Sequence, residues 1–178
     1  MRTPRLICLA AAALVGALLV GGCSSEQTSL SEKEGAPVHL GDLSYNVVIT
    51  RYLNPNDDED VDYLQGAPPL PDDQYYLGVF IQVANDTDST QSLPQTLNVV
   101  DTEGNRFDSV PMDNPFTLPL GSQVDAGDSV PSPESAAANG PIGGSMVLFL
   151  IDQSSTENRP LELEIPGSGE TGRIELDL

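Results

Sequence analysis

Residues 54–62, with the sequence Asn-Pro-Asn-Asp-Asp-Glu-Asp-Val-Asp, are a dense run of oxygen-bearing side chains in the 178-residue chain. Carboxylate and amide oxygens are the ligands that Ca²⁺ takes in proteins. If Asn54, Asn56 and Asp58 are aligned with the first three ligands of an EF-hand loop, Glu59 occupies the turn position that requires glycine. Gln65 then occupies the position of the bidentate glutamate. This leaves a Ca²⁺ site of another geometry and a solvated loop as the two alternatives.

Other residues that carry catalytic or metal chemistry are scarce. His39 is the single histidine, so a serine hydrolase would depend on it as the base. Copper binding would rely on His39, Met112 and Met146, which show no motif spacing, and Met146 belongs to an apolar run. The chain has no Trp and 5% aromatic residues, which argues against platforms for sugar stacking. We therefore expect a protein that is not an enzyme and that has no cofactor, no catalytic residue and no dedicated metal site.

The N-terminal segment has the organisation of an export signal. Arg2 and Arg5 precede an apolar run over residues 6–20, which is too short for a comfortable membrane span. The following residues, Val20-Gly21-Gly22-Cys23, resemble the lipobox of bacterial lipoproteins. That resemblance implies a signal peptide over residues 1–22, cleavage after Gly22 and attachment of lipid at Cys23. Two or three acyl chains bury enough CH₂ groups for stable anchoring in the membrane.

The two cysteines, Cys8 and Cys23, are both accounted for by this processing. Cys8 is removed with the signal and Cys23 carries lipid, so the mature domain has no free thiol. A disulfide, a zinc–thiolate site and a cysteine nucleophile are thereby excluded from the domain. The fold must be stabilised by its core.

The mature chain is strongly acidic. The full sequence has a formal charge of −20, and loss of Arg2 and Arg5 leaves five basic residues against 27 acidic ones, or −22. Nucleic-acid binding requires clustered Lys and Arg, so this class of partner is excluded. A highly solvated, repulsive surface accounts for the charge, and attraction to cations is the alternative.

The mature chain divides into a tether and one domain. Residues 23–36 comprise the lipidated Cys23 and a Ser- and Glu-rich segment with few large apolar side chains. A flexible segment of this length spans about 20 Å on average, so we expect it to hold the domain away from the membrane. Residues 37–178 are long enough to form one hydrophobic core.

Hydrophobic side chains in residues 37–178 recur with a period of two, which is typical of β-strands with one buried face. In residues 43–53, the odd positions Leu43, Tyr45, Val47, Ile49 and Leu53 are predicted to share the buried face. In residues 75–85, the odd positions 75–83 are predicted to do the same. Residues 145–151 are almost wholly apolar, as in a central strand. The complete set of predicted strands is 38–40, 43–53, 75–85, 96–101, 106–110, 145–151, 161–165 and 174–178.

Proline and glycine spacing leaves room for one helical turn at most, at residues 134–139. Short strands without intervening helices predict an all-β fold, an antiparallel two-sheet sandwich of about seven or eight strands. Residues 102–105 are predicted to form a hairpin turn. The long connections 54–73 and 111–141 are predicted to be functional or mobile loops. We expect deletion of residues 57–62 to leave the fold intact, because the run contains no predicted core residue.

Two stretches are similar to a recurring family. Residues 76–87, Tyr-Leu-Gly-Val-Phe-Ile-Gln-Val-Ala-Asn-Asp-Thr, combine an apolar strand with Asn85 and a polar turn. Residues 97–107 continue with a strand, Asp101, a turn containing Gly104, and the aromatic Phe107. This arrangement resembles the immunoglobulin-like (telokin-like) extracellular domain of bacterial lipoproteins, which is of unknown function. The resemblance implies an immunoglobulin-like sandwich over residues 37–178 and implies no catalytic residues. We interpret Asn85-Asp86-Thr87 as a turn rather than a glycosylation site.

These observations together predict a lipoprotein held by its lipid anchor on the extracytoplasmic face of a bacterial cell membrane. We expect it to be a non-enzymatic protein-interaction or surface module, with a membrane or envelope protein as its partner. An apolar patch formed by Tyr75, Tyr76 and residues 68–71 is one predicted docking surface. The alternative function is binding of a small ligand or divalent cation by the acidic loop 54–73.

Overall fold

The computed structural model describes residues 28–178, so the predicted signal peptide and Cys23 lie outside the described residues. The described part contains twelve strands, the short helix α1 (Ala136–Asn139) and one 3-10 turn, η1 (Gln153–Thr156). The all-β prediction is confirmed, and α1 is the single helical turn expected near residue 136. All eight predicted strands are present: β2 (Val38–Leu40), β3 (Leu43–Leu53), β4 (Gln74–Ala84), β6 (Asn98–Val100), β7 (Arg106–Val110), β10 (Ser145–Asp152), β11 (Leu161–Pro166) and β12 (Glu170–Leu176).

Four strands were not predicted. Three of them, β5 (Gln91–Ser92), β8 (Gln123–Val124) and β9 (Ser129–Val130), contain two residues each, too few for an alternation pattern. The fourth, β1 (Thr28–Lys33), is polar and lies in the segment expected to be a tether.

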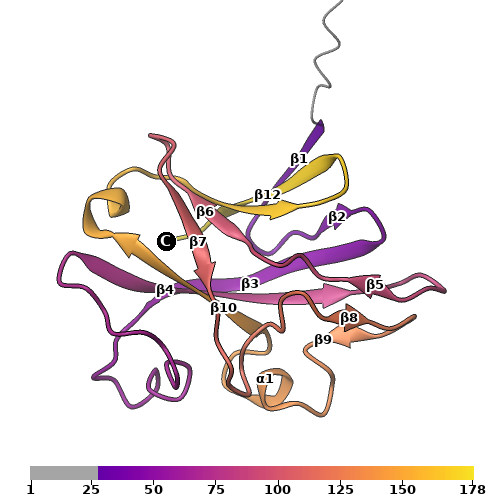
Figure 1. Ribbon diagram of the computed structural model, residues 1–178, viewed down its shortest axis with the longest axis horizontal. Helices are drawn as coiled ribbons and strands as arrows, with labels where there is room; N and C mark the ends of the chain where they lie inside the picture. The colour runs from indigo at the N-terminus through magenta and orange to yellow at the C-terminus, as the bar shows by residue number, and fades with distance from the viewer. Residues whose placement is uncertain (1–27) are drawn as a thin grey trace, which may run out of the picture.

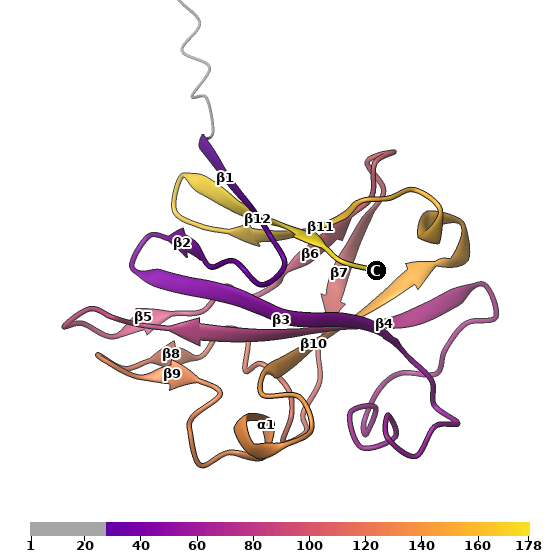
Figure 2. The same ribbon diagram turned by 180° about the vertical axis from the view of Figure 1, so that it is seen from behind.

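Ten of the described strands form one sheet whose hydrogen-bonded path folds over into two layers (Figures 1 and 2), and β5 pairs with β8 in a separate two-stranded sheet. The order along the path is β1-β12-β11-β6-β7-β10-β4-β3-β2, and β9 adds to β4. Strand β7 joins the layers, because residues 106–108 pair with β6 and residues 109–110 pair with β10. β1 runs parallel to β12, whereas the other pairings within this path are antiparallel. The strands therefore do not separate into two independent antiparallel sheets.

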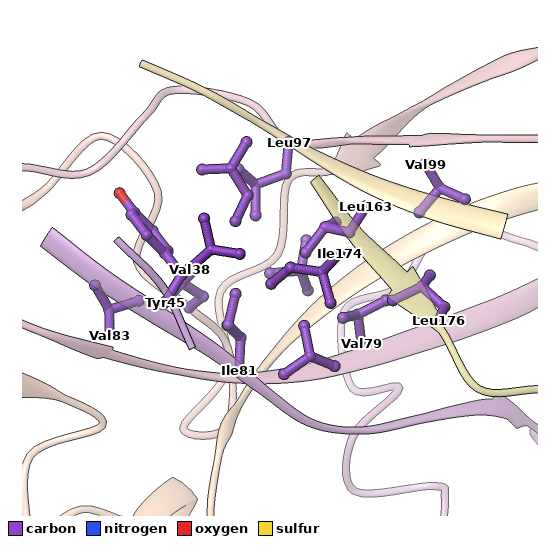
Figure 3. Packing of buried hydrophobic residues seen from close by; sticks show 14 of the residues in the cluster. Val38, Tyr45, Val79, Ile81, Val83, Leu97, Val99, Leu163, Ile174 and Leu176 are labelled. Carbon is purple, nitrogen blue, oxygen red and sulfur yellow. The ribbon is translucent and has the colours of Figure 1, made fainter. Parts of the chain in front are cut away.

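The main core lies between the two layers. Figure 3 shows Val79, Ile81 and Val83 of β4 facing side chains of the other layer, such as Leu163 and Ile174. All five are fully buried. Burial also raises the pKa of the Tyr45 phenol to about 12, so this side chain stays neutral at physiological pH. Of the alternating positions predicted to be internal in β4, 75 to 83, those from 77 to 83 form the centre of the core. The prediction is wrong for Tyr75, which is 42% exposed near the start of the strand.

A second hydrophobic cluster lies on the other face of β4 and β10. It contains Tyr76 and Phe80 of β4 together with Met146 and Leu148 of β10. The two long connections cover it, and the aromatic ring of Tyr63 contacts both Phe80 and Phe116, with ring centroids 5.0 and 4.9 Å apart. β4 and β10 are therefore buried on both faces. The long connections form a third layer over part of the sheet, which the alternation pattern did not reveal.

A β-bulge in β3 changes which side chains face the main core. The register against β4 shifts between Val47 and Ile49. An extra residue in one strand reverses the alternation beyond it. Ile49 and Leu53 consequently lie on the outer face, opposite Phe80 and Tyr76, and the prediction that they share a face with Leu43 is wrong. Ile49 is 39% exposed.

The segment 34–36 closes the second seam between the layers. The main-chain N–H of Glu34 donates to the Glu175 carbonyl of β12, and that of Gly35 donates to the Val47 carbonyl of β3. The Glu34 carboxylate then accepts from the N–H of Thr50 and from that of Asp177, each at 3.1 Å. The prediction of a flexible tether is therefore wrong for residues 28–36, since their polar groups bond to the backbone at the edges of both layers.

We expect Glu34→Ala to lower the free energy of unfolding by about 1–2 kcal/mol, because two backbone N–H groups lose a charged acceptor that water replaces only in part. Urea unfolding followed by circular dichroism measures the difference. Glu32→Ala is the matched control, because Glu32 lies on the same segment and is exposed. Equal losses for the two variants would contradict the bridging role of Glu34.

The turn between β6 and β7 is organised around a buried carboxylate. Asp101, 5% exposed, accepts the main-chain N–H groups of Glu103 and Asn105 and the side-chain amides of Asn105 and Asn158, at 2.8–3.0 Å. Gly104 has φ of 86°, a conformation that glycine adopts without strain. The predicted hairpin turn over residues 102–105 is confirmed, and Asp101 fastens it to the chain after η1.

Candidate functional site

A cleft of about 380 Å³ opens on the outer face of the β3–β4–β9 region, beside the second hydrophobic cluster. Its floor is formed by Ser44 and Asn46 of β3 and Gln82 of β4, which are cross-strand neighbours on one face. Pro131 and Ala138 form its walls. Strand β9 and the segment after α1 border this half of the outer face and leave it open. Other parts of the two long connections cover the other half. We call the open cleft the outer-face cleft.

The chemistry of the outer-face cleft is that of neutral amides and hydroxyls. None of its ten lining residues is charged. The Gln82 amide donates to the Gly143 carbonyl at 2.6 Å, which fixes the side chain against the wall. The Asn46 Oδ1 atom is buried and has no hydrogen-bond partner. An acceptor left in this way costs about 1–3 kcal/mol.

Exposed apolar side chains extend the outer-face cleft along β3. Because of the bulge, Ile49 follows Asn46 as the next side chain of β3 on the outer face, and Val48 occupies the bulge itself. Val48 is 38% exposed and Ile49 is 39% exposed. The outer-face cleft and these two residues form a neutral strip in a chain with strong negative charge. Neutral, partly apolar surface is where an acidic protein presents least electrostatic repulsion to another protein.

The basic side chains of residues 28–178 are engaged elsewhere. Arg106 and Arg173 both bind the carboxylate of Glu164, which is 7% exposed, on the outer face of the other layer. Lys33 pairs with Glu175 at 3.0 Å. Arg51 pairs with Asp60, and Arg159 donates to the carbonyls of Thr156 and Leu178. The chain thus carries a large excess of acidic side chains, and none of them lines the outer-face cleft.

The acidic loop 54–73 is held to the sheet by a buried ion pair. Asp60 is 2% exposed, and its carboxylate binds the Arg51 guanidinium and accepts the Asn54 N–H at 2.8 Å. Two residues downstream of the acidic run, Leu64 packs on the second cluster beside Tyr63. The expectation that residues 57–62 can be deleted without harm to the fold disagrees with this geometry, because Asp60 ties the loop to β3.

Of the aligned calcium ligands, Asn54 is turned toward the backbone, because its Oδ1 accepts the Asn56 N–H at 3.0 Å. The neighbouring Asp57 Oδ1 accepts the Glu59 N–H at 3.0 Å. Over residues 28–178, no group of three or more His, Cys, Asp or Glu side chains is placed to hold a metal ion. The geometry thus gives these residues a role in turn formation.

The predicted patch of Tyr75, Tyr76 and residues 68–71 is not one surface. Adjacent residues of a strand point to opposite faces. Tyr76 is 5% exposed and its hydroxyl donates to the Pro68 carbonyl, whereas Tyr75 is 42% exposed and lies 5.6 Å from the Tyr52 ring on the other side. The proline segment covers Tyr76 and is separated from Tyr75 by the sheet.

The remaining candidate residues are also placed. His39 is exposed on β2, two strands away from β4, whereas Met146 is fully buried on β10, so the proposed copper ligands do not meet. The Asn85 amide is fully buried and donates to the carbonyls of Ser89, Val124 and Asp125. The interpretation of residues 85–87 as a turn is confirmed. Cys23 lies outside the described residues.

Sequence reasoning missed the outer-face cleft. Ser44, Asn46 and Gln82 were assigned to the polar face of two strands, and such faces are usually solvated. The sequence did contain a signal for the cleft. The residues on this face of β3 and β4 are polar but uncharged, and they lie next to the apolar Val48 and Ile49. The cover over the rest of the face depends on contacts distant in sequence, such as Asn114 with the Tyr63 and Gln65 carbonyls.

No protein-family model matches the sequence, and no curated protein matches it. Solved structures do match the fold. An uncharacterized β-sandwich protein from Clostridium difficile is 12% identical with a TM-score of 0.52, covering 85% of this chain and 97% of its own. A secreted protein from Mycobacterium tuberculosis is 12% identical with a TM-score of 0.53, covering 83% and 98%. The yjhA protein from Bacillus subtilis is 12% identical with a TM-score of 0.51, covering 82% and 98%.

These similarities define the class of the fold as a β-sandwich. At such identity the likeness extends to the fold and not to activity. Within residues 28–178, no helix has the length and apolar composition needed to cross a bilayer.

Proposed function

We propose that this chain is a lipid-anchored, non-enzymatic binding module on the extracytoplasmic face of a bacterial membrane, with an immunoglobulin-like (telokin-like) sandwich as its domain. The lipobox-like residues before Cys23 support the anchor, and the partner is a membrane or envelope protein. The domain docks this partner through the neutral strip of the outer-face cleft, Val48 and Ile49.

The observation that carries the docking proposal is the absence of charged residues from the lining of this cleft in a chain with a formal charge of −20. The outer-face cleft has no charged lining residue, and its Asn46 Oδ1 lacks a donor. Two exposed aliphatic side chains continue it along β3. Polar groups that orient a partner and apolar area that is removed from water are the two components of a protein interface.

The lipid would act by confinement. Restricting a binding module to the membrane raises its effective concentration toward partners in the same membrane. β1 begins at Thr28, so four residues connect Cys23 to the domain. Such a connection reaches at most about 18 Å when extended, which keeps the domain close to the membrane surface.

Site-specific photocrosslinking in native membranes tests the proposal. A photoreactive amino acid at Ile49 is expected to give one adduct of defined mass, whereas the same amino acid at Glu162, on the outer face of the other layer, gives none. In the chain that carries the photoreactive amino acid at position 49, Asn46→Ala and Val48→Asp should each reduce the adduct yield. Removal of the anchor by Cys23→Ala should release the chain from the membrane and lower the adduct yield.

Each outcome has one meaning for the proposal. The same adducts at both positions, or an adduct unaffected by Val48→Asp, would refute docking at the neutral strip. A Cys23→Ala variant that remained membrane-bound and correctly trimmed would refute the anchor without bearing on the strip.

A further inference from the structure

A second recess, which we call the interlayer crevice, opens between the two layers on the side where β7 joins them. It has a volume of about 340 Å³ and is lined by the chain before β6, the end of β7 and residues 117–120. Its floor contains Leu118 and Val147, both 2% exposed and both members of the main core. The interlayer crevice therefore reaches core side chains directly from the surface.

The sequence explains why the layers separate here. Pro111 follows the last residue of β7 and has no N–H with which to extend the pairing to β10. β7 thus pairs with β10 only at residues 109–110. Beyond that point, Thr117 forms a parallel bridge with Met146, and the Leu118 N–H donates to the Met146 carbonyl at 2.8 Å. The chain between the two contacts bulges outward and leaves the recess.

The walls of the interlayer crevice are held in place by hydrogen bonds. Ser109 exchanges bonds with Leu97, through both its main chain and its hydroxyl. The Gly121 N–H donates to the Pro94 carbonyl at 2.9 Å and the Leu93 N–H to the Ser122 carbonyl at 2.9 Å. The recess exists without a conformational change, so binding there would not have to order the walls.

The lining chemistry identifies the class of ligand. None of the eleven lining residues is charged. The lining combines apolar side chains such as Met112 and Leu120 with the hydroxyl or amide groups of Gln95, Thr96 and Thr117. A pocket of this size with an apolar floor and a few polar groups suits a small molecule. We propose that the interlayer crevice binds a small, uncharged, partly apolar molecule carrying a hydroxyl or amide group.

Disulfide-exchange tethering tests this inference on the full-length chain in nanodiscs of neutral lipid. Thr96→Cys places a thiol on the rim, and Ser31→Cys places one on exposed β1 as the control. Each is equilibrated, in the presence of 2-mercaptoethanol, with two phenyl-bearing fragments of equal size supplied as mixed disulfides, one ending in a hydroxyl and the other in a carboxylate; exchange links the fragment to the protein and releases the other thiol. Intact mass gives the fraction modified, and the parent chain reports any reaction at Cys23.

The expected result is a preference for the hydroxyl fragment at Thr96→Cys that exceeds the preference at Ser31→Cys by about tenfold, equivalent to about 1.4 kcal/mol. Leu120→Trp, which fills the interlayer crevice, should abolish the excess, and Met112→Trp provides a second filling variant if the first does not fold. Equal preferences at the two positions, or an excess that survives filling, would overturn the inference. Neither outcome depends on docking at the outer-face cleft.

Discussion

Asp101→Asn is expected to lower the free energy of unfolding by about 3 kcal/mol at neutral pH. The Asp101 carboxylate accepts hydrogen bonds from N–H groups through both oxygens, whereas the NH₂ group of the asparagine would face N–H groups to which it cannot bond. Both Asn105 and Asn158 donate side-chain amides to Asp101 Oδ2, at 2.8 and 3.0 Å. For a domain of this size the loss corresponds to a decrease in Tm of about 6–12 °C. Glu103→Gln, in the same turn but exposed, is the control and should stay within about 0.5 kcal/mol of the parent.

The effect of Asp101 should depend on pH with a defined sign. Burial raises the pKa of Asp101, but the hydrogen bonds from Asn105 and Asn158 outweigh it, so the pKa lies well below its ordinary value. A carboxyl with a depressed pKa contributes stability above its unfolded pKa of about 3.9 and loses it as pH falls toward the folded value. The difference in free energy of unfolding between the parent and Asp101→Asn should therefore become smaller below about pH 4. A difference that stays constant from pH 7 to pH 3 in urea titrations would contradict the assignment.

Asp60→Ala should lower the free energy of unfolding by about 3 kcal/mol. This value is near the lower end of the range for breaking a buried ion pair, because Arg51 retains partial exposure. The variant also removes the acceptor of the Asn54 N–H. Loss of this link frees the loop that covers the second hydrophobic cluster. Urea unfolding with near-ultraviolet circular dichroism, which reports the packing of Tyr63 against Phe80, measures both consequences.

Asp58→Ala provides the matched control within the same acidic run. Asp58 is exposed, and its removal also lowers the density of like charge, so we expect a change within about 0.5 kcal/mol. Similar losses for Asp60→Ala and Asp58→Ala would show that the run acts through its total charge rather than through one ion pair.

The strands could be predicted because each of the eight carries its own alternation or apolar run. β10 is an example, since seven consecutive residues from Ser145 are largely apolar and the strand lies between β4 and β7. The longest of the four strands that were not predicted, β1, has no large apolar side chain except Leu30. Its structure depends on pairing with β12, a partner about 140 residues away, which no local pattern contains.

The candidate sites were harder to predict because each is a part of the sheet surface that the rest of the chain leaves uncovered. The alternation in β3 identified Asn46 as polar and Ile49 as buried, but a bulge placed Ile49 beside Asn46 on the outer face. Leu118 carries no local sign that the chain around it forms the wall of a recess. The acidic run suggests a metal site because its side chains carry oxygen ligands that are easily recognised in a sequence. The ion-pair partner of Asp60, Arg51, lies on another element, β3.

Under the proposed lipid anchor at Cys23, the parallel pairing of β1 with β12 has a mechanical consequence. A pulling force transmitted through residue 28 acts along the axis of β1, with Thr28 opposite Glu170 and Lys33 opposite Glu175. The load is then shared by the whole six-residue ladder in shear, instead of peeling its hydrogen bonds apart one after another. The bonds made by Glu34 and Gly35 stand in series behind that ladder. Tension between the membrane and a captured partner would thus meet the most force-resistant geometry that a β-sheet offers.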